Sequence, residues 1–140
     1  MKREIPIPPL IWKLTGALEL PYTSLLEMER VKPVHIRKED ISELVEDKYH
    51  IFSYYPKNAE RNFEVYQVEM ESGCEYTSSG HSSNSYEYLM LMEGRAAVIV
   101  NDCEYQLEKD DALYFDASVP HSYVNREEQT AKIVMLIQYL

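Results

Sequence analysis

The sequence predicts an all-β domain, a sandwich or a closed barrel, with short helices before it. Short runs rich in Val, Ile, Tyr and Phe follow one another from residue 34 onward. Turn residues separate these runs, and no helical periodicity lies between them. The chain also has 12 tyrosines against 3 phenylalanines, and Tyr favours strands.

Each expected strand is a run of β-favouring residues bounded by turn signals. The runs are residues 34–37, 49–55, 63–70, 86–92, 95–100, 104–107, 112–116, 119–124 and 132–139. Asn101 and Asp102 tolerate positive backbone angles, so we expect a tight hairpin there. Residues 77–85 are rich in Ser and are expected as a polar loop at the mouth of the barrel.

The helices are expected before residue 32. Residues 8–18 begin with two prolines, which suit a first helical turn, and the apolar side chains of this segment recur at helical spacing on one face. Pro21 ends that helix, and residues 23–28 begin a second one. The expected domains are therefore residues 1–32, helices plus linker, and residues 33–140, the β-domain.

Composition narrows the function classes. The formal net charge is −10, so these residues by themselves are not expected to hold DNA or RNA. We find no signal peptide and no apolar run of membrane-spanning length, so a cytoplasmic protein without membrane contact is expected. Cys74 and Cys103 are expected as free thiols, although a single bridge between them stays open.

Two motifs in register resemble those of the cupin family. The first motif is matched by Gly73, His81, Ser83, Glu87 and Gly94, and the spacing of the second by Asp110, Asp116, Ser118, His121 and Asn125. The resemblance covers residues 60–140 and implies a cupin fold, a double-stranded β-helix or small jelly-roll barrel. Ser83 stands where the family has a second histidine, and the glycines and proline of the second motif are replaced by Asp110, Asp116 and Ser118.

The resemblance implies a candidate metal site at His81, Glu87 and His121. Intact cupin motifs hold a divalent metal with three histidines and one glutamate, and here three of those four ligands remain. Two histidines and one carboxylate can bind Fe, Mn, Ni or Zn with open positions. The alternative is that these residues are polar groups hydrogen-bonded within a pocket, because the loss of one ligand weakens metal affinity.

The same residues are candidates for binding a small-molecule effector. A cavity lined by tyrosine hydroxyls, His121 and Glu87 would suit a small polar organic ligand. We therefore expect His81, Glu87, His121, Tyr114 and Tyr123 to bind effector. Further tyrosines that could line the interior are Tyr76, Tyr86 and Tyr88, although most tyrosines are expected in the core or on strand surfaces.

A second resemblance concerns residues 9–26, which are similar to the end of a helix-turn-helix domain of the XRE family. Residues 114–125 are similar to cupins attached to such regulators. Together they imply the effector-sensing, dimerising part of a DNA-binding transcriptional regulator, not an enzyme. The helix that reads DNA is largely missing from this chain, so DNA contact would need that segment.

Two alternatives stay open beside the regulator. One is a stand-alone metal-dependent cupin enzyme, dioxygenase- or isomerase-like, acting on a small molecule. The other is a dimerisation barrel without a ligand, since small barrels often bury exposed strand edges across a two-fold axis. A homodimer is expected for the regulator as well. No second acid or base stands out beside the three candidate ligands, and a fold alone assigns no chemistry.

Overall fold

The computed structural model describes residues 32–140, and Ile36–Leu140 form one compact unit. The helices predicted at residues 8–18 and 23–28 lie outside the described residues, as does all but residue 32 of the predicted first domain. No helix in the described part of the chain is long and apolar enough to cross a membrane.

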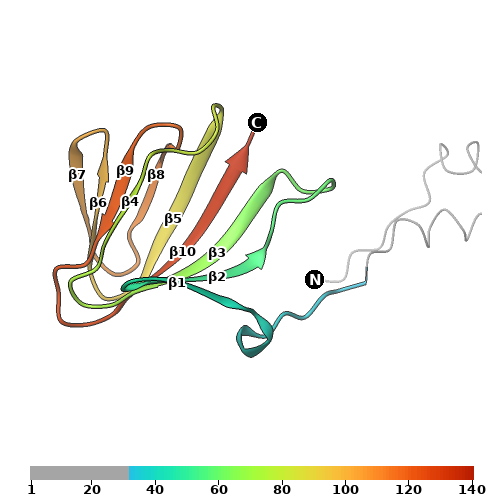
Figure 1. Cartoon of the computed structure of the whole chain (residues 1–140), viewed down its shortest axis with the longest axis horizontal. Helices are drawn as coiled ribbons and strands as arrows, with labels where there is room; N and C mark the ends of the chain where they lie inside the picture. The colour runs from blue at the N-terminus through green and yellow to red at the C-terminus, as the bar shows by residue number, and fades with distance from the viewer. Residues whose placement is uncertain (1–31) are drawn as a thin grey trace, which may run out of the picture. The chain divides into compact units, whose positions relative to one another are not determined.

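The described residues form ten antiparallel strands in two sheets, which confirms the predicted all-β fold (Figure 1). The strands are β1 (Glu43–Glu46), β2 (Tyr49–Tyr55), β3 (Phe63–Met70), β4 (Glu75–Ser78), β5 (Ser85–Glu93), β6 (Ala96–Val100), β7 (Cys103–Leu107), β8 (Ala112–Asp116), β9 (His121–Val124) and β10 (Ala131–Tyr139). The larger sheet has the order β1-β2-β3-β10-β5-β8, and the smaller has the order β4-β9-β6-β7.

Side chains alternate between inward and outward directions along the strands, and the inward ones form the core. In β5 the residues Glu87, Leu89 and Leu91 are buried while their neighbours are more exposed, and β10 alternates in the same way. β10 pairs with β3 on one side and β5 on the other, so its buried side chains lie in the middle of the larger sheet. A polar residue at an inward position of such a strand, as Glu87 is in β5, therefore lies deep inside the domain.

The hairpin predicted at Asn101 and Asp102 is confirmed. The two residues have φ of 47° and 66° and join β6 to β7, the geometry that a two-residue turn requires. The strand predicted at residues 34–37 is wrong. That segment contains no strand, and Arg37 instead donates to the carboxylate of Asp40 across a short 3-10 helix, Lys38–Asp40.

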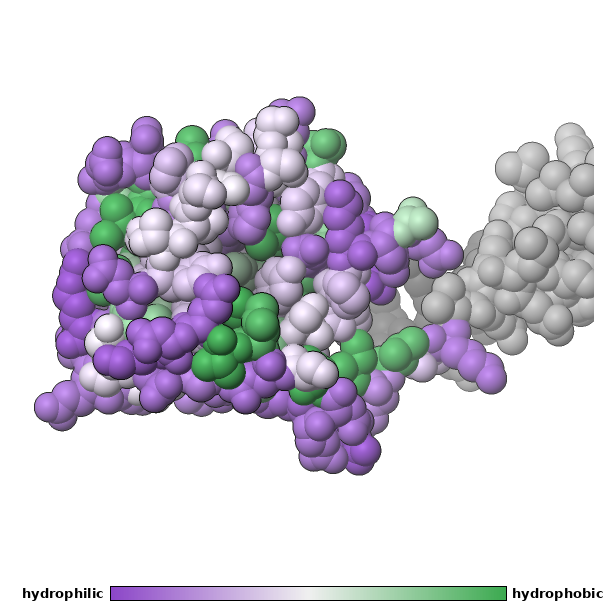
Figure 2. All heavy atoms as spheres, in the orientation of Figure 1, coloured by the Kyte–Doolittle hydropathy of each residue, from purple (hydrophilic) through white to green (hydrophobic). Residues whose placement is uncertain are grey.

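Two strands, β1 and β4, were not predicted. β1 is short and all four of its residues are exposed, so it has no inward apolar position to mark it. β4 includes Thr77 and Ser78 of the segment expected as a loop, and it pairs with β9 in the smaller sheet. Figure 2 shows hydrophilic side chains over much of the visible face, with hydrophobic ones in small separate groups.

Candidate functional site

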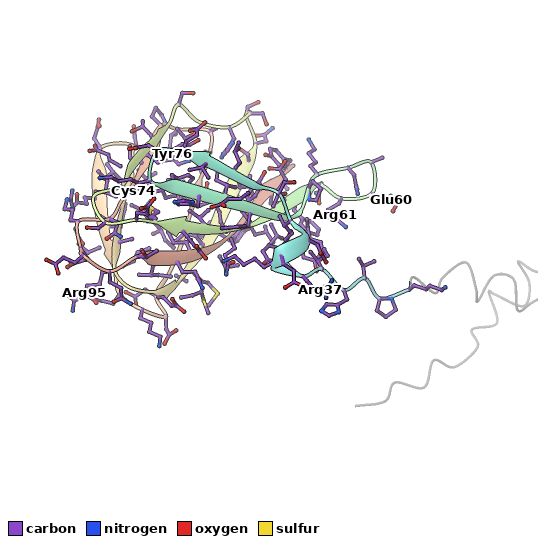
Figure 3. All side chains as sticks on the ribbon, turned by 60° about the horizontal axis from the view of Figure 1, so that its bottom comes forward. Arg37, Glu60, Arg61, Cys74, Tyr76 and Arg95 are labelled. Carbon is purple, nitrogen blue, oxygen red and sulfur yellow. The ribbon has the colours of Figure 1, made fainter. Side chains whose placement is uncertain are left out.

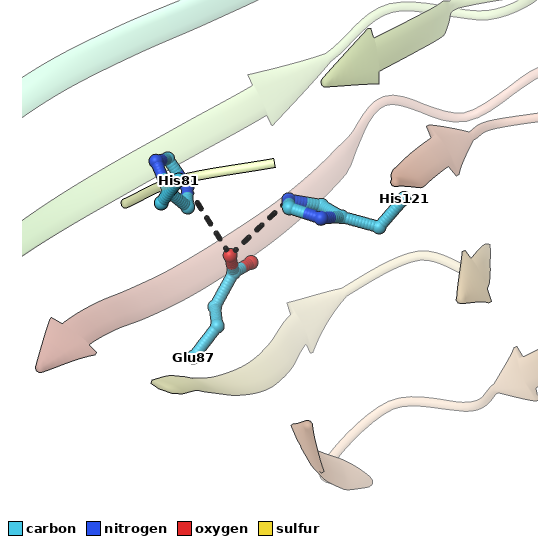
Figure 4. A group of neighbouring side chains, drawn as sticks. All are labelled: His81, Glu87 and His121. Carbon is cyan, nitrogen blue, oxygen red and sulfur yellow. Dashed lines mark ion pairs between the residues drawn. The ribbon is translucent and has the colours of Figure 1, made fainter. Parts of the chain in front are cut away.

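Three predicted residues from separate segments meet inside the barrel (Figure 4). Glu87 lies on β5, His121 begins β9, and His81 lies in the loop between β4 and β5. Nε2 of His121 lies 3.6 Å from Oε2 of Glu87, and Nε2 of His81 lies 3.8 Å from the same oxygen. Glu87 and His121 are buried, whereas the His81 side chain is 30% exposed. A molecule entering from solvent would therefore reach the carboxylate of Glu87 by passing His81.

The loop that carries His81 is fixed by close backbone contacts. The amide of His81 donates to the carbonyl of Ala117 at 2.8 Å. Gly80 has φ of +113°, and a Cβ atom there would lie 2.4 Å from the carbonyl oxygen of Ser118. Only glycine permits both that angle and that approach. The loop is thus held against the β8–β9 turn, which places His81 beside His121.

The orientation of His121 is set by its backbone neighbour. Nδ1 of His121 lies 2.8 Å from the carbonyl oxygen of Val119, which can only accept a hydrogen bond. The proton of a neutral imidazole is therefore on Nδ1, and Nε2 keeps its lone pair. Burial lowers the pKa of His121, more than the Val119 contact raises it, and this favours the neutral ring. His121 thus presents an acceptor toward Glu87.

Glu87 is a buried carboxylate with a hydroxyl partner on one oxygen. Tyr123 donates its hydroxyl to Oε1, while Oε2 faces the two imidazoles. Burial raises the pKa of Glu87 to about 7, although the hydroxyl of Tyr123 acts in the opposite direction. Among the described residues, neither Oε2 of Glu87 nor Nε2 of His121 has a hydrogen-bond partner. Buried polar atoms usually have one, so a donor or cation that reached these two atoms would pair with them.

A cavity of about 220 Å³ adjoins the three residues. Its polar lining includes Ser78, His81, His121 and Tyr123, and Glu87 lies behind the two histidines. Further lining side chains are Leu44, Tyr49, Ile51, Tyr66, Val68, Tyr76, Met135 and Ile137. The volume is below the range of about 300–1,000 Å³ for drug-sized ligands, so the cavity suits a smaller molecule.

Stacked tyrosine rings form one wall of this cavity. The rings of Tyr49 and Tyr76 lie 4.0 Å apart and almost parallel, and that of Tyr123 lies 5.9 Å from Tyr49. Figure 3 places Tyr76 beside the strands of the larger sheet, although Tyr76 itself belongs to β4 of the smaller one. The stack therefore joins the two sheets at the cavity and keeps its wall rigid.

The family follows from this fold and a sequence comparison. A model of the cupin domain matches residues 66–137, about half of the chain. The chain belongs to the cupin family. The HTH-type transcriptional regulator SutR of Escherichia coli (strain K12) is 26% identical to this cupin over 130 residues, which are 92% of this chain and 70% of that protein.

Solved structures agree with the family assignment. The cupin domain of an XRE family transcriptional regulator from Enterobacter cloacae is 18% identical, with a TM-score of 0.64 over 67% of this chain and 99% of that one. An HTH_3 family transcriptional regulator from Vibrio cholerae is 22% identical, with a TM-score of 0.63 over 96% and 73%. Enzymes also occur among structures of this fold, so these likenesses establish the fold alone.

The three residues are candidate ligands of a divalent cation. Bonds of about 2.0–2.2 Å place two ligands of one ion at most about 4.4 Å apart, and both measured separations from Glu87 are shorter. All three ligand atoms lie within 4.8 Å of one another, so a small approach of the two histidine nitrogens would bring the whole set within reach of one ion. The two unpartnered atoms, Oε2 of Glu87 and Nε2 of His121, are lone-pair donors of the kind that such an ion takes.

Not every predicted site residue reaches this place. His81, Glu87, His121 and Tyr123 do, as described above. Tyr114 lies on the outer face of β8 and is 56% exposed, so the structure does not bring it to the cavity. Its ring packs instead against Tyr86 and Tyr88, which lie on the same outer face.

The departures from the cupin motif fall mainly on turns. Asp110 stands for a motif glycine and still adopts φ of 72°, an angle that Asp tolerates better than most residues. Asp116 accepts hydrogen bonds from the backbone amide and the hydroxyl of Ser118, at 2.9 and 2.6 Å, and so closes the turn itself. Asn125, by contrast, retains the residue of the motif; directly after β9, it donates to the carbonyl of Met70 at 3.0 Å and so ties the end of β9 to β3.

Ser83 is the departure that alters the site. It is exposed in the loop before β5, so it contributes nothing to the buried cluster. The alternation that would have aligned it with Glu87 does not extend into this loop, because β5 begins only at Ser85. The cupin cluster here is therefore limited to His81, Glu87 and His121 among the described residues.

Several cavity residues were not singled out by the motifs. Tyr49 and Ile51 on β2, Tyr66 on β3 and Ser78 on β4 line the cavity, yet none belongs to a motif position. Their inward direction depends on strand register. Alternation within residues 49–55 could have indicated Tyr49 and Ile51 as sharing one face. Nothing local marks Ser78, which the sequence placed in a loop.

Proposed function

We propose that this cupin is the effector-sensing and dimerising domain of an XRE-family transcriptional regulator. The observation that carries the proposal is the extent of the likeness to the E. coli regulator, 130 residues and 92% of this chain. The barrel unit begins only at Ile36, so the likeness must include part of the segment before it. That segment holds residues 9–26, which resemble the end of a helix-turn-helix domain.

The cavity supports the sensing part of this proposal. It offers two buried acceptors, Nε2 of His121 and Oε2 of Glu87, whose pairing with a ligand would remove the cost of leaving them unpaired. Two kinds of ligand complement these acceptors. One is a small molecule that donates hydrogen bonds from an amine or hydroxyl, and the other is a cation. Such a ligand regulates only if it binds two conformations of the protein with different affinity.

DNA binding is tested on the product of the complete gene. A gel-shift assay with the DNA upstream of that gene should give a sequence-preferring complex that excess unrelated DNA does not remove. A complex that unrelated DNA displaces equally well, or no complex at all, would contradict the regulator.

Effector binding is tested on the chain itself by a thermal-shift screen with amino acids, polyamines and sugars. A ligand at one hundred times its dissociation constant stabilises the folded state by about 2.7 kcal/mol. We expect the shift to be lost in His121→Ala and kept in His35→Ala, which removes an exposed histidine outside the cavity. Equal shifts in both variants would place the ligand elsewhere.

A metal-dependent enzyme is the second candidate, and the fit of His81, Glu87 and His121 to a divalent cation favours it. A metal bound there would act as a Lewis acid toward a ligand oxygen. Glu87 would hold such an ion with its free oxygen, while Tyr123 fixes the other one. Elemental analysis of the purified chain decides this. Stoichiometric Fe or Mn would support the enzyme. A metal-free protein whose His121→Ala variant still binds ligand fully would end the idea.

A further inference from the structure

The outer face of the six-stranded sheet is apolar across its middle. Six side chains point outward there and define what we call the outer patch: Tyr88 and Met90 of β5, Ala112 and Tyr114 of β8, and Val134 and Leu136 of β10. Tyr114, Met90, Tyr88 and Val134 are 56, 49, 42 and 37% exposed. Figure 1 shows β5, β10 and β3 side by side.

Strand register makes the outer patch continuous. Met90 lies opposite Val134 on one side and Ala112 on the other. Tyr88 lies opposite Leu136 and Tyr114 in the next row. β3 extends both rows with uncharged residues, because Gln67 pairs with Val134 and Val65 with Leu136. Two hollows of about 420 and 440 Å³ lie over these strands.

Charge is confined to the margin of this face. At one end Lys132 lies 3.9 Å from Glu69 and 3.8 Å from Glu93, and Lys38 also pairs with Glu69, so two lysines offset two glutamates there. Asp116 stands at the other end, beyond Tyr114 on β8. Charged residues make up 27% of the chain, yet none occupies the two rows. A large exposed apolar patch with a polar rim is typical of a protein interface.

A second copy of this chain fits the outer patch better than other partners. Four strands at about 4.8 Å spacing are about 19 Å wide, whereas a helix is about 10 Å across and would leave half of the face exposed. A basic partner attracted by the net charge of −10 would find no carboxylate in the two rows. In a pair of identical sheets, the apolar rows of one copy contact the apolar rows of the other, and no like charges face each other.

An adjoining hollow extends the outer patch beyond its six side chains. Its lining continues from Tyr88 and Leu136 to apolar Phe63 and polar Gln138. Standard interfaces combine an apolar centre with a polar rim in this way. We propose that two copies of the chain pair through the outer patch, face to face across a two-fold axis. This locates the dimerisation named in the proposed function and rests on that part of it.

The test measures the mass of the full chain by light scattering and by sedimentation at a series of micromolar concentrations. We expect a dimer for the unaltered chain and a monomer for Tyr114→Glu, which buries a charge in the interface. Tyr105→Glu is the matched control, because Tyr105 is 45% exposed on an edge strand, β7, of the other sheet. It should stay dimeric. Circular dichroism checks that each variant is folded, and Met90→Gln, a milder change, should weaken the dimer severalfold.

Oxidation by peroxide identifies what covers the outer patch. A second copy should protect Met90 only at concentrations where the dimer forms. Protection of Met90 in a sample that light scattering shows to be monomeric would mean that another part of the same chain covers the face, and this would overturn the proposal. So would a monomeric unaltered chain, or an equal loss of dimer in Tyr105→Glu. Failure of the gel-shift assay alone would refute the regulator and leave this interface standing.

Discussion

Glu87 combines burial, two neighbouring imidazoles and a tyrosine hydroxyl in one place. A buried carboxylate is costly when charged, and this explains why its pKa is raised to about 7. The hydroxyl of Tyr123 offsets part of that cost and leaves Oε2 directed at His81 and His121. Tyr123 is therefore a positioning residue for whatever pairs with Oε2.

Replacing Tyr123 by Phe should raise the pKa of Glu87 above about 7 in metal-free protein, because the charged carboxylate loses its donor. The free energy of unfolding at pH 8 should fall by about 1–3 kcal/mol, the cost of an unsatisfied buried acceptor. NMR titration of the Glu87 carboxyl carbon and urea unfolding measure the two effects. Tyr76→Phe, in the same ring stack, is the control and should leave the pKa of Glu87 unchanged. Equal shifts of the Glu87 pKa in both variants would show that the hydroxyl of Tyr123 does not specifically stabilise the charged carboxylate.

At the scale of elements, β1 is held to the barrel mainly by polar contacts. Its four residues are exposed, and it pairs only with β2 in the sheet order. The imidazole of His50 on β2 bridges two carboxylates, Glu43 of β1 and Glu71 at 2.7 Å. Leu44 of the same strand lines the cavity. The contact at His50 therefore holds an edge strand that borders the candidate site.

This contact should depend on pH. Hydrogen bonds to Glu71 and then Glu43 raise the pKa of His50 above its usual value near 6.5. The stabilisation is therefore complete below about pH 6.5 and is lost as pH rises through the higher folded-state pKa. We expect His50→Gln to lower the free energy of unfolding by about 1 kcal/mol or less at pH 6, and by less at pH 9. Urea unfolding of both proteins at the two values tests this. A difference that grows with pH would contradict the sign.

The sequence located the strands that carry a strong signal. Residues 49–55, 63–70 and 112–116 match the observed strands to the residue, because they are β-rich and end in turns. β4 was missed because Thr77 and Ser78 belong to a polar run that has no apolar alternation. Its strand character comes from pairing with β9, a contact between residues 43 or more positions apart. Single-sequence patterns cannot supply such pairing.

The candidate site divides in the same way. The spacing of His81, Glu87 and His121 matches a known motif. This match was sufficient to predict that three residues distant in the sequence lie close together. Tyr114 was expected beside them but lies on the opposite face of its strand, since parity places Phe115 inward. Tyr49 and Tyr76 could not be assigned, because they meet through stacking between two sheets. The motifs thus predicted which candidate ligands would meet, whereas the side chains of the cavity wall could be assigned only from strand register.

At the scale of the whole molecule, the net charge and the outer patch act against each other. Each chain carries a formal charge of −10, so two copies repel at long range. The middle of the outer patch contributes no charge of its own, and its contact is apolar. Salt screens the repulsion between whole molecules but leaves apolar contact intact.

Dimerisation should therefore strengthen as salt is added. Raising the ionic strength from about 0.01 M to about 0.1 M shortens the screening length from about 30 Å to about 10 Å, and we expect the dissociation constant of the dimer to fall severalfold. Sedimentation equilibrium at the two salt concentrations measures it. The Tyr114→Glu variant in the same buffers controls for effects of salt on the folded monomer. A dimer that dissociates on adding salt would instead be held by ion pairs, and the outer patch, which has no charge in its two rows, could not then be the interface.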